Sequence, residues 1–76
     1  MDKHWLPDEQ LQIPSGYIML ERSRDHVLAF CPDSTMGRYA VWTIGRNGIL
    51  HTGLYSRDPR DAADVFELRS GVVIGG

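Results

Sequence analysis

The chain has 76 residues, of which 42% are hydrophobic and 24% are charged, and its formal net charge is −2. This length limits it to one domain, and the balance of apolar and charged residues excludes a disordered chain. No apolar run approaches the ~20 residues of a membrane-spanning helix, and the negative net charge argues against strong binding to nucleic-acid phosphates.

Residues 1–14 are expected to form an N-terminal arm, followed by a single α+β domain at residues 15–76. The arm is polar and rich in proline, so it contains no sustained helix or strand pattern. We expect one or more of its apolar side chains, Trp5, Leu11 or Ile13, to pack onto the domain.

Three short segments predict the first strands of a sheet. Tyr17–Glu21 and His26–Cys31 are apolar runs separated by a polar cluster, which is typical of a strand pair. Tyr39–Ile44 is rich in aromatic and β-branched residues, and it is the clearest strand in the sequence.

A hairpin turn and a fourth strand follow. Asn47 and Gly48 together accept the two positive φ angles of a type I′ turn, whose twist matches that of paired strands. Ile49–Tyr55 then returns as a strand. Gly53 within it indicates a bulge or the close approach of another group.

The helix signal is stronger than any strand signal. Asp58 suits the N-cap position and Pro59 the first helical position. Side chains then recur at spacings of three and four residues, which places the apolar ones on one face: Ala62, Val65, Phe66 and Arg69. Gly71 is placed to end the helix in the left-handed conformation. Val72–Ile74 is then either a short extra strand or a packed tail.

These elements predict an α+β fold, a small antiparallel β-meander of about four strands with one C-terminal helix packed on one face. A small open sheet leaves edge strands, and one face, to be covered. A homodimer is therefore one expected state.

The sequence indicates no enzyme, metal or other cofactor. Cys31 is the single cysteine and lies in an apolar run, which favours a buried thiol in a cytoplasmic protein. No secretory signal is recognised, which also favours the cytoplasm. His26 and His51 lie on different expected strands, but no close pair of ligands accompanies them. Phosphate-loop, dinucleotide and nucleophile-elbow motifs are absent, and so short a chain has little room for a substrate pocket.

Charged residues suggest a surface that binds another protein. Acidic residues recur at every third position of the expected helix: Asp58, Asp61, Asp64 and Glu67. This stripe is either a solvated face or a patch that meets a basic partner. Arginine is favoured at interfaces because its planar group pairs bidentately and stacks on rings. The candidate protein-binding residues are therefore Asp61, Asp64, Glu67, Arg38 and Arg46.

The alternative function is a nucleic-acid-binding sheet, in which bases stack on exposed aromatic rings beside arginines. Its candidate residues are Trp42, Tyr55, Arg22 and Arg46. In so small a domain such rings are more often core or cross-strand partners. Exposure of Trp42 or Tyr55 is the feature that discriminates between the two functions.

A set of spaced positions runs through the second half of the chain: Tyr39, Trp42, Gly48, Gly53-Leu54-Tyr55, Asp58, Ala62 or Ala63, Phe66 and Arg69. In this pattern the chain resembles a diffuse set of small, mostly uncharacterised bacterial and phage-borne proteins, although Leu54 stands where we expect a polar residue or histidine. The resemblance implies a meander followed by a helix, with no agreed activity or catalytic residues. The compact size, the absence of catalytic motifs and the content of arginine and aromatic residues lead us to expect a non-enzymatic protein-binding module or small accessory subunit, such as a phage-type inhibitor of a host defence complex.

Overall fold

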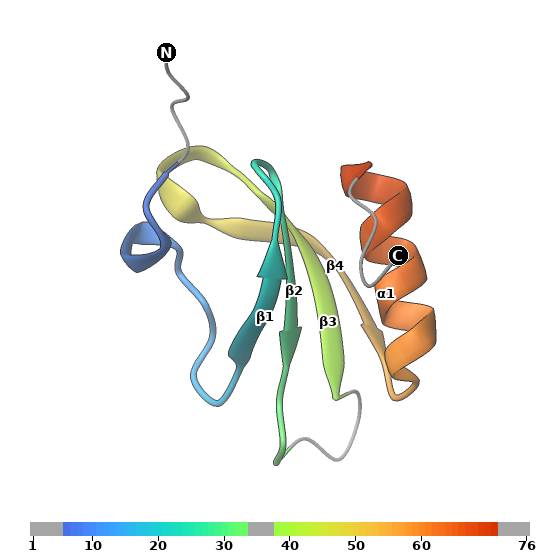
Figure 1. The fold of residues 1–76 in the computed structure, drawn as a ribbon. Coiled ribbons are helices and arrows are strands. Elements are labelled where there is room, and N and C mark those ends of the chain that lie inside the picture. Colours follow the sequence, from blue (N-terminus) through green and yellow to red (C-terminus); the bar gives the residue numbers. More distant parts are fainter. Residues whose placement is uncertain (1–5, 34–37, 72–76) are drawn as a thin grey trace.

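The computed structural model describes residues 6–33 and 38–71. These residues form a four-stranded antiparallel sheet in the order β1-β2-β3-β4, with one helix packed against it (Figure 1). The elements are β1 (Ile18–Arg22), β2 (His26–Phe30), β3 (Tyr39–Ile44), β4 (Leu50–Ser56) and α1 (Pro59–Ser70). The predicted meander with a C-terminal helix is confirmed. The expectations for Trp5 and for Val72–Ile74 fall outside the described residues.

The two central strands are buried on both faces. Residues 27–29 of β2 and residues 40–42 of β3 are all buried. Because consecutive residues of a strand point to opposite sides of a sheet, both sides of these strands need apolar side chains. This explains why neither sequence alternates between apolar and polar residues.

One face of the sheet is covered by α1, which packs on β2, β3 and β4. Ala62 and Phe66 of the helix are fully buried there, in a cluster with Leu28 and Val41. The spacing of four residues between Ala62 and Phe66 puts both on the side of the helix that faces the sheet. The predicted inner face of the helix is therefore confirmed.

Both predicted ends of α1 are confirmed as well. The Asp58 side chain accepts a hydrogen bond of 3.0 Å from the backbone N–H of Arg60, and Pro59 follows the cap. Gly71 has a φ of 77° and donates its N–H to the carbonyl of Glu67 at 2.8 Å. A left-handed glycine of this kind ends a helix without the strain that a side chain would add.

The opposite face of the sheet is covered by the arm, which includes a single 3-10 turn, η1 (Asp8–Gln10). Leu11 is buried against Val27 and Trp42, and Leu6 and Ile13 are partly buried on the same cluster. The prediction that arm side chains pack onto the domain is confirmed for Leu11 and Ile13. The described residues thus form three layers, in the order arm, sheet and helix (Figure 1).

The turn between β3 and β4 is the type I′ turn that the sequence predicted. Asn47 and Gly48 have φ angles of 59° and 81°, and the N–H of Ile49 donates to the carbonyl of Arg46 at 3.2 Å. The turn also contacts the arm, because Gln12 donates its N–H to the carbonyl of Gly48 at 2.9 Å. A β-carbon on Gly48 would overlap the backbone of Gln10.

Candidate interaction surface

The helix does not reach across the whole sheet, and apolar side chains of β1 stay exposed beside it. In register, Ile18 pairs with Phe30, and Phe30 pairs with Tyr39, so the three lie in one row across the sheet. Leu20 lies two residues after Ile18 and therefore on the same side. Ile18 and Leu20 are 54% and 46% exposed, and we call these two residues the β1 strip.

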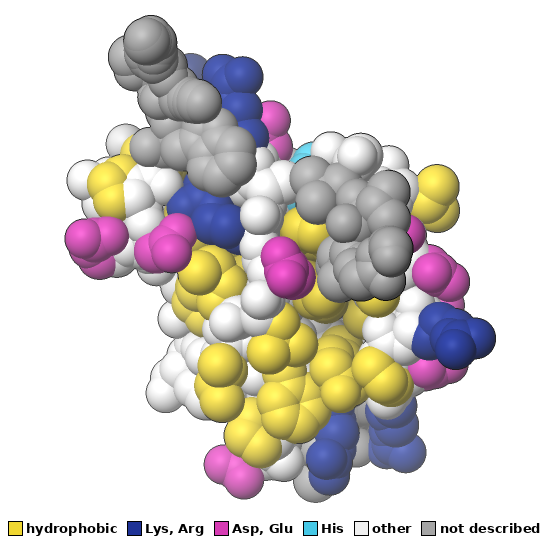
Figure 2. Space-filling model, in the orientation of Figure 1, with side chains coloured by type: hydrophobic (Ala, Val, Ile, Leu, Met, Phe, Trp, Pro, Cys, Tyr) yellow, Lys and Arg dark blue, Asp and Glu magenta, His cyan; other side chains and the backbone are white. Residues whose placement is uncertain are grey.

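Figure 2 shows that hydrophobic side chains gather over the lower parts of β1, β2 and β3, next to the helix. A β-bulge interrupts the pairing of β1 with β2 at Leu20. This residue is the extra one between the Met19–Ala29 pair and the Glu21–Leu28 pair. Glu21, which is exposed, ends the strip on the side toward the β1–β2 turn.

The outward side of α1 carries the predicted acidic residues. Asp61 and Asp64 are exposed, whereas Glu67 is half-buried. Asp61 also accepts a hydrogen bond from the Ser56 hydroxyl at 3.3 Å, which ties the first turn of the helix to the end of β4. Leu68 on the same helix is 84% exposed and is the most exposed of the large hydrophobic residues described.

The two arginines predicted for the same surface are not brought together. Arg38 immediately precedes β3, and Arg46 lies in the turn that follows it, so the length of the strand separates them. Both are exposed. The predicted set thus divides into acidic residues on the helix and single arginines at opposite ends of β3.

The two aromatic candidates for nucleic-acid binding, Trp42 and Tyr55, differ in their exposure to solvent. Trp42 is only 4% exposed, and its ring meets that of Tyr17 edge-on at a centroid distance of 5.0 Å. Its indole N–H donates to the hydroxyl of Tyr55 at 3.3 Å, and Tyr55 is 57% exposed. The close approach expected at Gly53 is confirmed, because a β-carbon there would lie 2.8 Å from the Trp42 nitrogen. Trp42 is therefore a core residue and offers no ring face to a base.

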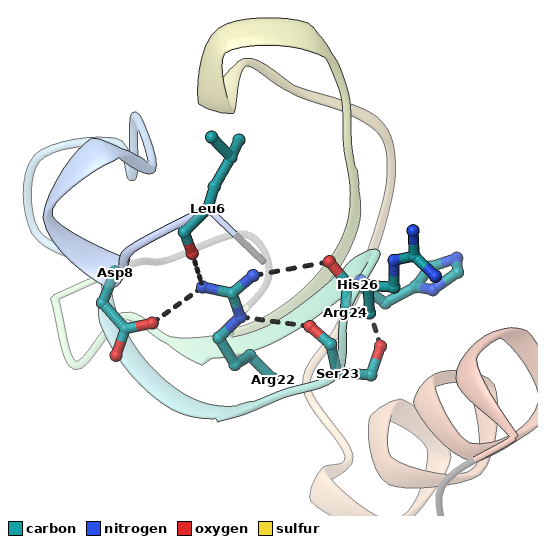
Figure 3. A network of polar contacts seen from close by, with 6 residues as sticks. All are labelled: Leu6, Asp8, Arg22, Ser23, Arg24 and His26. Carbon is teal, nitrogen blue, oxygen red and sulfur yellow. Dashed lines mark hydrogen bonds and ion pairs between the residues drawn. The ribbon is translucent and has the colours of Figure 1, made fainter. Parts of the chain in front are cut away.

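Arg22, the other central candidate of that alternative, holds the arm in place (Figure 3). Its Nη1 donates to the carbonyl of Leu6 at 2.7 Å and to a carboxylate oxygen of Asp8 at 2.8 Å, and its Nε donates to the carbonyl of Ser23 at 3.1 Å. The side chain is only 9% exposed. Sequence reasoning missed this role, because an arginine at the end of an apolar run resembles any surface residue of a hairpin.

His26 begins β2 near the C-terminal end of α1. Burial lowers its pKa, the positive charge of Arg69 lowers it further, and the carboxylate of Asp25 opposes both effects. Arg69 is held in position by a hydrogen bond of 2.7 Å to the carbonyl of Thr52. The neutral form of His26 is therefore favoured in the folded protein.

The histidines and the cysteine do not converge. Thr43 of β3 pairs with both His26 and His51, so the two histidines are separated by a whole strand. Cys31 is a buried free thiol just after the end of β2, as expected, whereas His26 begins the same strand. Within residues 6–33 and 38–71, no group of three or more His, Cys, Asp or Glu side chains is arranged to hold a metal ion.

No protein-family model matches the chain, and neither the curated proteins nor the solved structures contain a significant match to it. In the part of the chain that the structure describes, no helix is long and apolar enough to cross a membrane. The 12 residues of α1 are fewer than the ~20 that a span requires.

Proposed function

We propose that this protein is a non-enzymatic, cytoplasmic protein-binding module that acts as a small accessory or inhibitory subunit. The observation that supports the proposal is the β1 strip, where two aliphatic side chains on a sheet face are about half exposed. Contiguous exposed apolar patches on small proteins mark interaction sites more often than single exposed residues do. The partly buried rings of Phe30 and Tyr39, 4.9 Å apart, continue the strip across the sheet.

Charged groups beside the strip would select the partner. Glu21 borders it on β1, and Asp61 and Asp64 add negative charge on the outward side of α1. A partner with an apolar centre and basic residues around it would complement this arrangement, because charges at the rim of an interface govern specificity and association rate. Inhibition of a host defence complex is one concrete form of this function, because phage-type inhibitors of such complexes are small, acidic and poor in motifs.

The test compares capture of partners by strip variants and by a matched control. Tagged protein is incubated with extract of the source cell, and bound proteins are identified by mass spectrometry. The strip variant is Ile18→Asn with Leu20→Asn, and the control is Tyr55→Asn, which removes a similarly exposed side chain from the other sheet face. Circular dichroism verifies that all three proteins are folded.

We expect one or more proteins to be recovered with the wild type and the control, and recovery with the strip variant to fall about tenfold or more. Burying each aliphatic side chain contributes about 1.5 kcal/mol or more, and 1.4 kcal/mol corresponds to a factor of ten. Equal recovery with the strip variant would contradict the assignment of the surface. Recovery of nucleic acid alone at low salt would contradict protein binding.

Nucleic-acid binding is the second candidate function, and two exposed residues favour it. Tyr55 is 57% exposed, and Arg46 is exposed in the β3–β4 turn. Trp42 and Arg22 give nucleic-acid binding no support, because Trp42 is a core residue and Arg22 holds the arm. A mobility shift of a single-stranded oligonucleotide that weakens with salt and is lost in Tyr55→Ala would favour this function over protein binding.

A further inference from the structure

The two outer strands of the sheet share a feature that the two central strands lack. The central strands, β2 and β3, pair through five consecutive residues without a shift. On β1, Leu20 is an extra residue in the pairing with β2. On β4, Thr52 and Gly53 lie together opposite Trp42 of β3, so this strand also has one extra residue. Both edges of the open sheet are therefore interrupted by a β-bulge.

The bulge on β4 has a strained backbone. Thr52 has a φ of 56°, in the left-handed region that favours glycine. A β-branched residue rarely adopts this conformation, and it persists only where the surrounding contacts hold it. Two contacts do so here. The carbonyl of Thr52 accepts a hydrogen bond of 2.7 Å from Nη1 of Arg69, and its hydroxyl is hydrogen-bonded to Nδ1 of His51 at 2.8 Å.

We propose that the two bulges close both edges of the sheet to further strands, and that Arg69 holds the bulge on β4 in place. An edge strand exposes N–H and C=O groups on which a strand of another molecule can pair. The Thr52 carbonyl is already bonded to Arg69, so it is not available to such a strand. The helix that carries Arg69 therefore protects the edge of the sheet as well as covering one face.

The bulges leave only short stretches of regular backbone at each edge. On β1, two regularly paired residues lie on each side of Leu20. On β4, two regularly paired residues precede the bulge and three follow it. Strands in sheets usually have about five or six residues, and a bulge also bends the strand in which it lies. Neither edge therefore offers a continuous template for pairing.

Closed edges restrict the way in which any partner can bind. A protein can bind an extended peptide by adding it as a strand to an exposed sheet edge, through main-chain hydrogen bonds. The bulges disfavour this mode on both outer strands of this sheet. Side-chain contacts on a face of the sheet, such as those proposed for the β1 strip, need no free edge. The inference itself goes beyond the proposed function, because it concerns the edges and holds whether or not the strip binds a partner.

The first experiment removes the bulge on β4. Deletion of Thr52 leaves Gly53 alone opposite Trp42, which makes the pairing with β3 continuous. We expect the shortened chain to associate about tenfold or more tightly than the wild type in sedimentation velocity, because several main-chain hydrogen bonds can form between two copies. Hydrogen exchange at the amides of β4 should slow when it associates. Thr52→Ala keeps the extra residue, so this matched control should associate as the wild type does.

The second experiment tests the role of Arg69 without changing the length of the chain. Arg69→Met removes the donor to the Thr52 carbonyl, whereas Arg69→Lys keeps a charged donor. We expect Thr52 to leave the left-handed region in Arg69→Met, as measured by the NMR chemical shifts and scalar couplings of its backbone, and association to tighten. Arg69→Lys should restore most of the wild-type behaviour. Arg60→Met, which changes an exposed arginine of the same helix, should have neither effect.

Three results would overturn the inference. The first is a deletion variant that folds, as verified by circular dichroism, but associates no more tightly than the wild type. If the deletion variant does not fold, Arg69→Met decides, and an unchanged Thr52 conformation with unchanged association is the second. The third is tighter association that is lost when Ile18→Asn and Leu20→Asn are added, because the contact would then lie on the β1 strip and not at the edge. That last result would leave the proposed function standing, so the two proposals fail separately.

Discussion

Gly48 and Gly71 share a left-handed backbone, with φ angles of 81° and 77°, but they differ in their surroundings. A β-carbon on Gly48 would overlap the backbone of Gln10, whereas a β-carbon on Gly71 would meet nothing within 4 Å. Alanine in the left-handed region costs about 1 kcal/mol at either position. At Gly48 it must also displace the arm.

We therefore expect Gly71→Ala to lower the free energy of unfolding by about 1 kcal/mol and Gly48→Ala to lower it by about 3 kcal/mol. Urea denaturation monitored by circular dichroism measures both values. Equal losses in the two variants would show that the arm does not pack on the β3–β4 turn.

His26 makes stability depend on pH in a defined direction. Its pKa is lowered in the folded protein, mainly by burial, whereas the unfolded chain has a pKa near 6.5. Between these two values the unfolded chain binds more protons, so the free energy of unfolding decreases as the pH falls below about 6.5. The stabilising contribution is complete above the pKa of the unfolded chain and is lost on acidification.

His26→Gln should reduce this loss, measured as the difference between denaturation at about pH 7.5 and at about pH 5.5. The matched control is His51→Gln, which replaces an exposed histidine of β4. A His26→Gln variant that loses as much stability on acidification as the wild type would contradict the prediction.

Single residues in the sequence indicated the turns better than they indicated which side chains are exposed to solvent. Asn47 and Gly48 indicated their turn because few residue pairs accept two positive φ angles. The burial of Trp42 depends on the strand register and on the space left by Gly53, neither of which is visible in the local sequence. Half of the aromatic and arginine candidates for nucleic-acid binding therefore proved to be structural.

Among the structural elements, the arm depends most on one side chain. Arg22 donates hydrogen bonds to the arm through Leu6 and Asp8 and to its own hairpin through Ser23. Lysine cannot reproduce this planar arrangement of donors. The partly buried carbonyl groups of Leu6 and Ser23 would lose their partners, which is more costly than the loss of an exposed ion pair.

Arg22→Lys should therefore lower the free energy of unfolding by about 2 kcal/mol and accelerate hydrogen exchange at the Gln12 amide, which donates to Gly48. Asp8→Asn is the comparison, because Asp8 is 61% exposed and its charge should contribute about 0.5 kcal/mol or less. If the two variants lose the same stability, the ion pair and not the backbone contacts holds the arm.

Elements with strong local signals were predicted closely. The helix has a capping side chain and a terminal glycine, and both of its predicted ends agree with the structure. The first strand begins at Ile18 and not at Tyr17, because the N–H of Tyr17 donates to the carbonyl of Pro14 in a turn. The arm has no periodicity, so its role as a complete layer is visible only in the structure, where Leu11, Leu6 and Ile13 pack on the sheet.

On the scale of the whole molecule, the two apolar clusters share the central strands. Leu11 packs on the arm side of β2 and β3, whereas Phe66 packs on the helix side. A substitution that destabilises the arm or the helix should therefore also destabilise the layer on the other face of the sheet. Since single domains of this size usually unfold in one cooperative transition, we expect the layers to unfold together.

Leu11→Ala should lower the free energy of unfolding by about 2–4 kcal/mol, because it leaves a cavity at a residue that is only 7% exposed. Urea denaturation followed by NMR should show the amides of α1 and of β3 moving to the same lower midpoint. A helix that keeps its wild-type midpoint while the arm detaches would show that the layers are independent.

The contact between the arm and the β3–β4 turn has a consequence for biosynthesis. Gln12 and Asn47, which are joined by a hydrogen bond, are 35 residues apart, whereas the hairpins of the meander join strands that follow one another along the chain. Contacts between neighbouring segments form early in folding, and distant ones form late. During translation the arm is made before the β3–β4 turn and has no place to dock until that turn has formed. The apolar face around Trp42 stays open to solvent in that interval, so the delay before the arm docks determines how long the nascent chain can aggregate.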